Sequence, residues 1–294
     1  MRAWPIAGAL MADELLIASG LFVSYGKPRR SLFARTPRVS VPVLHGVNLE
    51  VHRGETVGIV GESGSGKTTL GRTLIGLVKP AAGSVRFDGV DVTTLDEQAM
   101  RPLRRRMQMI FQDPMSSLNP RHTIGRILTQ PMRLHGLASD AASARERVRD
   151  ILDRVGLTPG TMDCYSHELS GGQRQRVGIA RAVVLCPDFV IADEIVSGLD
   201  VSTQAQVLRL LKELTSEMHL ALAFISHDLS VIRSICDRVV VMQSGSIVEQ
   251  GACEQVFAAP RAAYTRMLLD AIPLPVLDPD WLMRGPAVEH VGMN

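Results

Sequence analysis

Aromatic side chains, cysteines and long apolar runs are all scarce in this sequence of 294 residues. Aromatics make up 4% of the chain, too few for the stacking platforms that bind single-stranded nucleic acid. The net charge of +2 gives no basic excess, so we expect no nucleic-acid partner. No CxxC pair occurs, which argues against a zinc or cluster site. We expect the four cysteines to be reduced, mostly buried thiols of a cytosolic protein. They are Cys164, Cys186, Cys236 and Cys253.

No apolar run approaches the roughly 20 residues that a membrane-spanning helix needs. The N-terminus places Arg2 before a short apolar stretch, a faint likeness to a signal peptide, but Pro5 interrupts the stretch and Asp13 and Glu14 follow at once. We therefore expect residues 1–14 to be a disordered tail, with Met11 as a second candidate start. If the protein works at a membrane, other chains must span it.

Expected strands and helices alternate along the chain, which predicts an α/β fold with a mostly parallel sheet and helices on its faces. The basic, proline-containing residues 26–42 predict a solvated loop, with a contact to phosphates or lipid headgroups as the weaker interpretation. Prolines beyond residue 259 predict an extended appendage. The expected strands are 15–25, 43–51, 56–60, a short pair within 82–95, 189–192, 220–225 and 239–242, and the expected helices are 67–78, 141–155, 173–185, 202–218 and 229–235.

A glycine-rich segment follows the apolar strand 56–60 and fits the phosphate-loop pattern GxxxxGK[ST]. Glycines let the backbone curl until its N–H groups face phosphate oxygens, and the next helix presents its positive end to the same anion. Lys67 is expected to reach the β and γ phosphates of ATP, and Thr68 to give its hydroxyl to Mg²⁺. A chance glycine-rich turn is disfavoured because a strand precedes the segment and a helix follows it. The segment consists of Gly61, Glu62, Ser63, Gly64, Ser65, Gly66, Lys67, Thr68 and Thr69.

Two acids end the apolar strand that begins at Phe189. At the carboxyl end of a strand, Asp193 can hold magnesium through water, and Glu194 can accept a proton from the attacking water or position it. Two acids after a strand can also be an ordinary loop start. Their position downstream of a phosphate loop favours the catalytic interpretation.

Residues 169–173, Leu-Ser-Gly-Gly-Gln, open an expected helix. A lone serine before two glycines would only cap that helix. The longer run 169–176 resembles the signature motif of ABC ATPases, and it lies about 100 residues after Lys67 and about 20 before Asp193, as in that family. The resemblance implies that two such domains face head to tail, so that the signature of one covers the γ-phosphate held by the other. That role falls to Ser170, Gly171, Gly172 and Gln173.

Four more positions match the same family. Gln112, in Phe-Gln-Asp-Pro, resembles the glutamine loop, which implies that it senses magnesium or the attacking water beside the membrane partner. Asp200 resembles the loop that communicates across the dimer. His227 resembles the switch histidine that contacts the γ-phosphate and orients Glu194, although a lone histidine is more often structural. Tyr25 lies where an aromatic ring usually stacks on adenine; ordinary strand packing is the alternative.

One position departs from the family pattern. Ile195 follows the expected catalytic glutamate, where proline is usual. Proline would restrict φ in that turn and isoleucine does not, so the path toward Asp200 is expected to differ slightly. Because Asp193 and Glu194 are present, hydrolysis is expected to survive.

The resemblance extends from about Leu21 to Pro273 and is nearest to ATPases of bacterial dipeptide, oligopeptide and nickel importers. The stretches 108–121, 199–206, 226–232 and 260–273 carry it. It implies a P-loop ABC nucleotide-binding domain over 15–258, with a mixed-sheet, RecA-like core, an antiparallel β part and a helical subdomain at about 115–175. A C-terminal extension of the peptide-importer type would follow over 259–294. Some relatives carry a cysteine-rich cluster site near the C-terminus, but with Cys253 alone in this region we expect none.

The resemblance also implies the partners: a second ABC ATPase that is a different chain, two transmembrane permease subunits and, indirectly, a solute-binding protein. The location would be the cytoplasmic face of the bacterial inner membrane. Nickel, glutathione or an opine-like solute stays open as an alternative cargo, because the ATPase does not touch the cargo. A soluble ABC ATPase acting on DNA or ribosomes is disfavoured by the single cassette and near-neutral charge, and a P-loop kinase has no use for the signature.

Overall fold

The computed structural model describes residues 14–26, 41–113 and 117–271, so the expectations for 1–13, most of the basic loop and the tail 274–294 lie outside the described residues. The described strands are β1 (Glu14–Tyr25), β2 (Val41–His52), β3 (Thr56–Val60), β4 (Ala82–Phe87), β5 (Val90–Asp91), β6 (Met107–Ile110), β7 (Phe189–Asp193), β8 (Ala221–Ile225), β9 (Arg238–Gln243) and β10 (Ser246–Ala252). The described α-helices are α1 (Lys67–Leu74), α2 (Glu97–Arg106), α4 (Ile124–Leu134), α5 (Ala141–Arg154), α6 (Gly171–Val183), α7 (Val201–Met218), α8 (Leu229–Ile235), α9 (Cys253–Ala258) and α10 (Ala263–Asp270).

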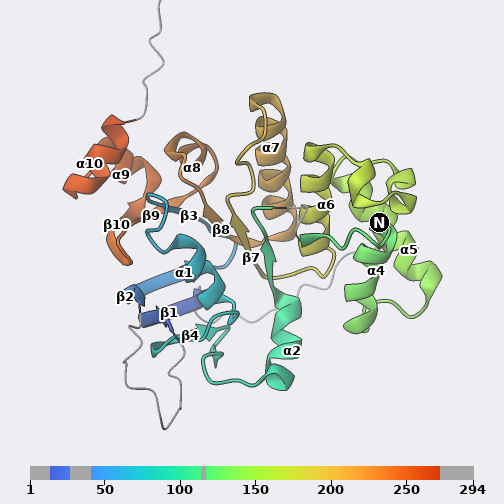
Figure 1. The fold of residues 1–294 in the computed structure, drawn as a ribbon, viewed down its shortest axis with the longest axis horizontal. Coiled ribbons are helices and arrows are strands. Elements are labelled where there is room, and N and C mark those ends of the chain that lie inside the picture. The colour runs from blue at the N-terminus through green and yellow to red at the C-terminus, as the bar shows by residue number, and fades with distance from the viewer. Residues whose placement is uncertain (1–13, 27–40, 114–116, 272–294) are drawn as a thin grey trace, which may run out of the picture.

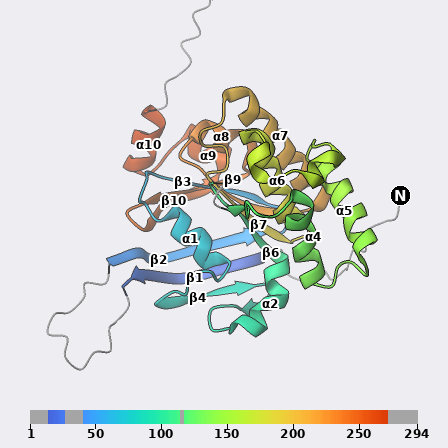
Figure 2. The same ribbon diagram turned by 45° about the vertical axis from the view of Figure 1, so that its right-hand side comes forward.

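Two sheets organise these elements (Figures 1 and 2). A six-stranded sheet has the order β10-β9-β3-β8-β7-β6. Adjacent strands in it are parallel, except that β10 pairs antiparallel with β9. A four-stranded antiparallel sheet has the order β2-β1-β4-β5. Every residue of β3, β7 and β8 is buried, as expected for parallel strands that are covered on both faces.

Helix α1 packs between the two sheets. Its residues Leu70 and Leu74 are fully buried in one apolar cluster with Leu16 of the antiparallel sheet and Ile59 of the mixed sheet. Because α1 begins at Lys67, within the glycine-rich segment, this packing fixes where that segment lies.

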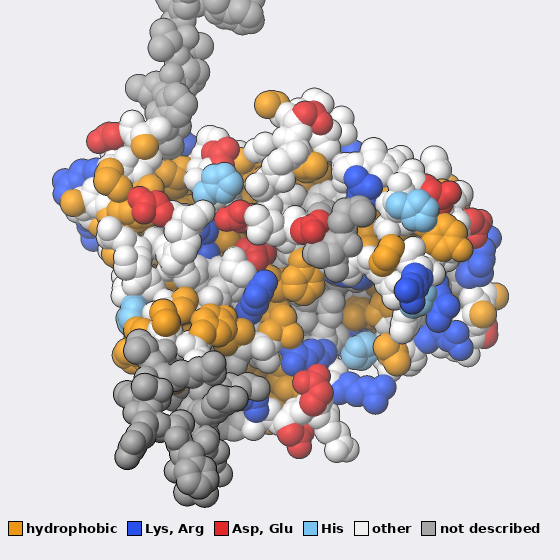
Figure 3. All heavy atoms as spheres, in the orientation of Figure 1, with side chains coloured by type: hydrophobic (Ala, Val, Ile, Leu, Met, Phe, Trp, Pro, Cys, Tyr) orange, Lys and Arg blue, Asp and Glu red, His pale blue; other side chains and the backbone are white. Residues whose placement is uncertain are grey.

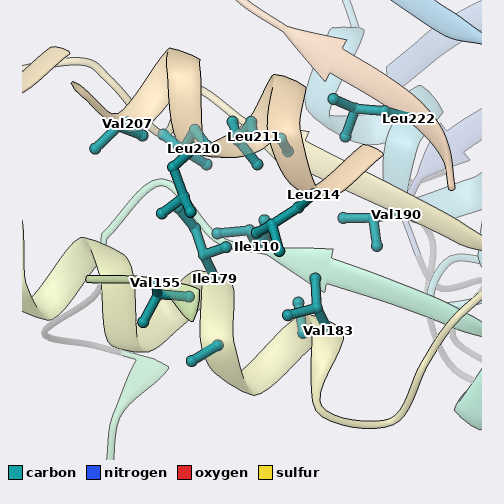
Figure 4. Packing of buried hydrophobic residues seen from close by; sticks show 14 of the residues in the cluster. Ile110, Val155, Ile179, Val183, Val190, Val207, Leu210, Leu211, Leu214 and Leu222 are labelled. Carbon is teal, nitrogen blue, oxygen red and sulfur yellow. The ribbon is translucent and has the colours of Figure 1, made fainter. Parts of the chain in front are cut away.

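Helices α6 and α7 cover the opposite face of the mixed sheet. Figure 4 shows Leu210, Leu211 and Leu214 of α7 beside Ile179 of α6 and Val190 of β7. All five side chains are buried, so this face forms the second apolar core of the protein.

A helical layer extends from this second core. Thr123 caps the start of α4, and Asp140 caps the start of α5, where its carboxylate accepts the N–H of Ser143. Val148 and Leu152 of α5 are fully buried, while the other side of the helix carries both arginines and acids. Lys and Arg side chains gather over this part of the surface (Figure 3).

The structure corrects several sequence expectations. The helix expected over 67–78 ends at Leu74, because Gly76 has φ +68° and turns the chain. The short strand pair expected within 82–95 is confirmed as β4 and β5, which end at Phe87 and Asp91. The appendage expected to be extended beyond residue 259 instead contains α10, whose Tyr264 and Thr265 are buried. The pattern did not reveal α2, β6, β10 and α9. Two of the four free thiols, Cys236 and Cys253, are buried, and the other two are half-buried.

Candidate functional site

The glycine-rich segment joins the central strand β3 to α1, as the sequence predicted. Three of its glycines have φ in the left-handed region: 149° for Gly61, 82° for Gly64 and 100° for Gly66. A Cβ at Gly61 would lie 2.1 Å from the carbonyl oxygen of Met242, so no larger residue fits there without movement of β9. The glycines therefore serve both the curl of the loop and its close approach to the neighbouring strand.

Lys67 is the first residue of α1 and its side chain is buried. Its ammonium donates hydrogen bonds to the carbonyl oxygens of Gly61 at 2.7 Å and Glu62 at 2.8 Å. Burial lowers the pKa of Lys67, and the nearby carboxylates of Glu194 and Asp193 oppose that shift. The site thus holds a cation at the start of a helix, which is an arrangement that attracts anions.

Thr68 and Asp193 meet although they are 125 residues apart. The Thr68 hydroxyl donates to Oδ1 of Asp193 at 3.0 Å. Burial raises the pKa of Asp193, and the hydrogen bond from Thr68 counteracts this. A buried carboxylate beside a hydroxyl is an all-oxygen donor pair, which fits Mg²⁺ held by one or two protein groups and substrate phosphates. In the part of the chain that the structure describes, no group of three or more His, Cys, Asp and Glu side chains could hold a metal by itself.

The carboxylate of Glu194 lies close to two further residues that the sequence predicted for the site. Its Oε2 accepts a hydrogen bond from Nε2 of Gln112 at 3.1 Å and lies 3.8 Å from Nδ1 of His227. Glu194 has φ 48°, an uncommon value for a residue other than glycine, and this turns the chain sharply at the strand end. A hollow of about 140 Å³ lies beside these groups and is lined by Glu194, Val196, Ser197, Gly198, Leu199, Gln204, Ser226, His227 and Asp228.

Strand register explains why these distant residues converge. β6, β7, β8 and β3 are parallel neighbours, and their ends are aligned to within one residue: Ile110 pairs with Ala192, Asp193 pairs with Ile225, and Ile225 pairs with Ile59. The next residues of each strand therefore emerge at one edge, which is where ligands bind in open parallel sheets.

Tyr25 lies at the margin of the phosphate loop. Its hydroxyl is 3.4 Å from Oγ1 of Thr69, and 47% of the residue is exposed. An exposed ring beside the loop is accessible to a ligand, and stacking on adenine stays a prediction.

The signature residues lie apart from the loop. Ser170 caps α6 by accepting the N–H of Gln173 at 3.3 Å, and the Gln173 side chain accepts the N–H of Ser170 at 2.9 Å. Among the residues that the structure describes, no hydrogen bond joins 170–173 to 61–69. Asp200 caps α7 by accepting the N–H of Thr203 at 2.9 Å. A Cβ at Gly172 would lie 2.8 Å from the methyl group of Thr203, so these two helix starts abut.

Ile195, which stands where a proline was expected, is buried in the second apolar core. The carboxylate of Glu194 next to it still meets Gln112. In this chain the turn is therefore anchored by an apolar side chain.

The sequence did not reveal the support that the C-terminal part of the chain gives the phosphate loop. The N–H of Gly245 donates to the carbonyl of Ser65 at 3.0 Å, and the N–H of Glu62 donates to the hydroxyl of Tyr264 at 3.1 Å. A single aromatic residue among small ones near residue 264 was the available signal.

Comparison with known proteins decides the family. The family model described as ABC transporter matches residues 44–197, more than half of the chain. This chain belongs to the ABC transporter family. It is an ABC-type ATPase that binds ATP, as the sequence predicted. The fold class is also confirmed, with a mixed sheet, an antiparallel sheet and added helices.

Relatives of this ABC ATPase are named for peptide import, which confirms the resemblance stated from the sequence. A protein of Brucella ovis named as a candidate peptide import ATP-binding protein is 52% identical over 84% of this chain and 77% of the relative. The oligopeptide transport ATP-binding protein OppF of Escherichia coli is 48% identical over 83% of this chain and 72% of OppF. A solved dimeric ATP-binding cassette with bound ADP and Pi superimposes with a TM-score of 0.72, is 27% identical, and covers 81% of this chain and 99% of the cassette.

Proposed function

We propose that the protein is the ATP-hydrolysing subunit of a bacterial ABC importer for dipeptides, oligopeptides or related small solutes. The convergence of Lys67, Thr68, Asp193, Glu194 and Gln112 at one sheet edge is the observation that carries the hydrolytic part. The relatives named for peptide import support the transport part.

The chemistry is attack of water on the γ-phosphorus, with cleavage of the bond to the β–γ bridging oxygen and release of ADP and phosphate. The loop N–H groups and Lys67 bind the phosphates and stabilise the charge that develops on them. Glu194 orients the attacking water and accepts its proton on the carboxylate. Gln112 and His227 hold that carboxylate in place, and His227 also contacts the γ-phosphate.

Thr68, Asp193 and Gln112 would hold Mg²⁺, which neutralises phosphate charge when it is bound. Tyr25 stacks on the adenine ring. Loop residues 61–69 bind the phosphates from one side. Ser170, Gly171, Gly172 and Gln173, together with Asp200, act on the nucleotide of the facing subunit. In support, no hydrogen bond among the described residues joins them to the phosphate loop of their own chain.

Two ATPase subunits, here two different chains, would then share two nucleotides and close on two transmembrane permease subunits that receive solute from a binding protein. No nucleic acid takes part. Among residues 14–26, 41–113 and 117–271, no helix is long and apolar enough to cross a membrane. We place the subunit on the cytoplasmic face of the inner membrane, with the ATPase domain over 15–258, the helical subdomain at about 115–175 and the extension over 259–294.

A transport assay tests the proposal. The gene for this chain is deleted, and the deletion strain is complemented with wild type or with Lys67→Ala. Uptake of labelled dipeptide, oligopeptide, nickel and glutathione is then measured in each strain. We expect peptide uptake to be lost on deletion and restored only by wild type. Unchanged peptide uptake with loss of nickel or glutathione uptake would refute the peptide assignment and identify the alternative cargo.

A further inference from the structure

The C-terminal helix α10 reaches the phosphate loop through one side chain. Tyr264 is 8% exposed, and its hydroxyl accepts the backbone N–H of Glu62, the second residue of the loop, at 3.1 Å. Figure 1 shows α10 with α9 beside the β9–β10 hairpin, outside the row of strands whose ends carry the catalytic groups. Residues 253–270 also lie outside the segment that the family model matches.

This hydrogen bond acts on the same peptide group that holds Lys67. The N–H of Glu62 and the C=O of Gly61 belong to one peptide unit, and no cis peptide occurs among the described residues. In a trans peptide these two groups point in opposite directions. The hydroxyl of Tyr264 therefore accepts the N–H on one side of this peptide group, while the ammonium of Lys67 donates to the carbonyl oxygen on the opposite side at 2.7 Å.

Tyr264 is itself held in place by the β10 strand. The carboxylate of Glu249 accepts the backbone N–H of Arg261 at 2.8 Å and that of Ala262 at 3.0 Å, directly before α10. Helix α10 has no other capping side chain at its start. Strand β10 pairs with β9, whose Met242 carbonyl packs against Gly61. The hairpin and the helix thus both contact the first turn of the loop.

We propose that Tyr264 is a positioning residue for ATP binding, which fixes the orientation of the Gly61–Glu62 peptide and thereby the place of Lys67. The inference rests on the proposed role of this loop as the phosphate site. Without the hydroxyl, the N–H of Glu62 loses its fixed partner and the first loop turn has more conformational freedom. ATP binding must then order that turn, so affinity falls by about two- to tenfold, the value of one neutral hydrogen bond.

Tyr264→Phe in the full chain tests this, because it keeps the ring in its apolar site and removes only the acceptor. We expect the Kd for ATP, and the KM in turnover, to rise by about two- to tenfold, with kcat at saturating ATP within about a factor of two. Hydrogen exchange at the Glu62 amide should become faster. Met267→Ala, on the exposed side of the same helix, is the matched control and should change none of these quantities.

Glu249→Ala provides a second route to the same effect, since it removes the anchor before α10. It should weaken ATP binding in the same direction, and combining it with Tyr264→Phe should cost less than the sum of the two. An unchanged Kd and unchanged Glu62 exchange in Tyr264→Phe would overturn the inference, as would a lower Tm with unchanged Kd. A Lys67→Ala chain that binds ATP as tightly as wild type would instead refute the loop assignment on which the inference rests.

Discussion

Replacing Glu194 by Gln removes the negative charge of this side chain and leaves its shape nearly unchanged, so it tests the role of the charge alone. The two side chains have nearly the same shape, and only 17% of the Glu194 side chain is exposed. The amide oxygen of Gln can still accept the hydrogen bond that Gln112 donates at 3.1 Å. We therefore expect the free energy of unfolding to change by less than about 1 kcal/mol.

Hydrolysis should respond very differently from folding. The substituted side chain cannot accept the proton of the attacking water, and general-base catalysis contributes about 100- to 10,000-fold to a rate. That factor corresponds to about 2.7–5.4 kcal/mol of transition-state stabilisation. ATP binding should persist, because Lys67 and the loop N–H groups are untouched.

Steady-state phosphate release and equilibrium ATP binding, measured on the same preparation, separate the two effects. The assay should use the assembled transporter, because the signature acts on the facing subunit. Glu254→Gln is the matched control, since Glu254 is an exposed residue of α9, and it should hydrolyse ATP like wild type. If Glu194→Gln retains more than about a tenth of wild-type turnover, Glu194 is not the general base.

Two further predictions concern titrating groups. A hydrogen bond from Arg106, together with the charges of Arg106 and Arg53, lowers the pKa of Asp88. Ionised Asp88 therefore stabilises the folded state at pH values above about 4, the ordinary pKa of an aspartate. This stabilisation is lost as the pH falls through the lowered pKa of Asp88 in the folded protein. Urea unfolding should therefore show that Asp88→Asn is less stable than wild type at pH 6 and that the difference shrinks on acidification; parallel stability curves would contradict this. Burial raises the pKa of Cys253 to about 11. At pH 8 a thiol reagent should therefore modify the half-buried Cys164 in the folded chain, but Cys253 only after unfolding. Peptide mapping of the labelled protein measures this. Equal labelling rates at the two sites would show that the core opens readily.

Local patterns predicted the elements of this protein well where the chain itself determines them. A buried strand, a glycine-rich turn and a helix starting at Lys67 follow from residue types that tolerate few other conformations. The sequence raised Ser170 as a possible cap of the following helix, and in the structure its hydroxyl accepts the N–H of Gln173. Asp200 and Asp228 cap α7 and α8 in the same way. The family motifs couple residue type to spacing, and the roles that they imply for these residues stay predictions.

Prediction failed where a segment depends on a distant partner. Helix α10 lies among prolines and has no capping side chain at its own start, and it is anchored by Glu249 and by the burial of Tyr264. Neither contact can be read from residues 259–271 alone. The short strand β6 was missed for a similar reason, because its pairing with β7 joins segments about 80 residues apart.

The sequence by itself determined the phosphate loop, the two acids after a buried strand and the signature, because each is a local run with its own backbone requirement. The resemblance implied that His227 lies near Glu194, but only the tertiary structure showed that Gln112 donates to the same carboxylate and that Tyr264 accepts the N–H of Glu62 in the loop. The reason is strand order: β6, β7, β8 and β3 lie side by side through pairing between segments far apart in the chain. Their common edge gathers residues that sequence spacing cannot bring together.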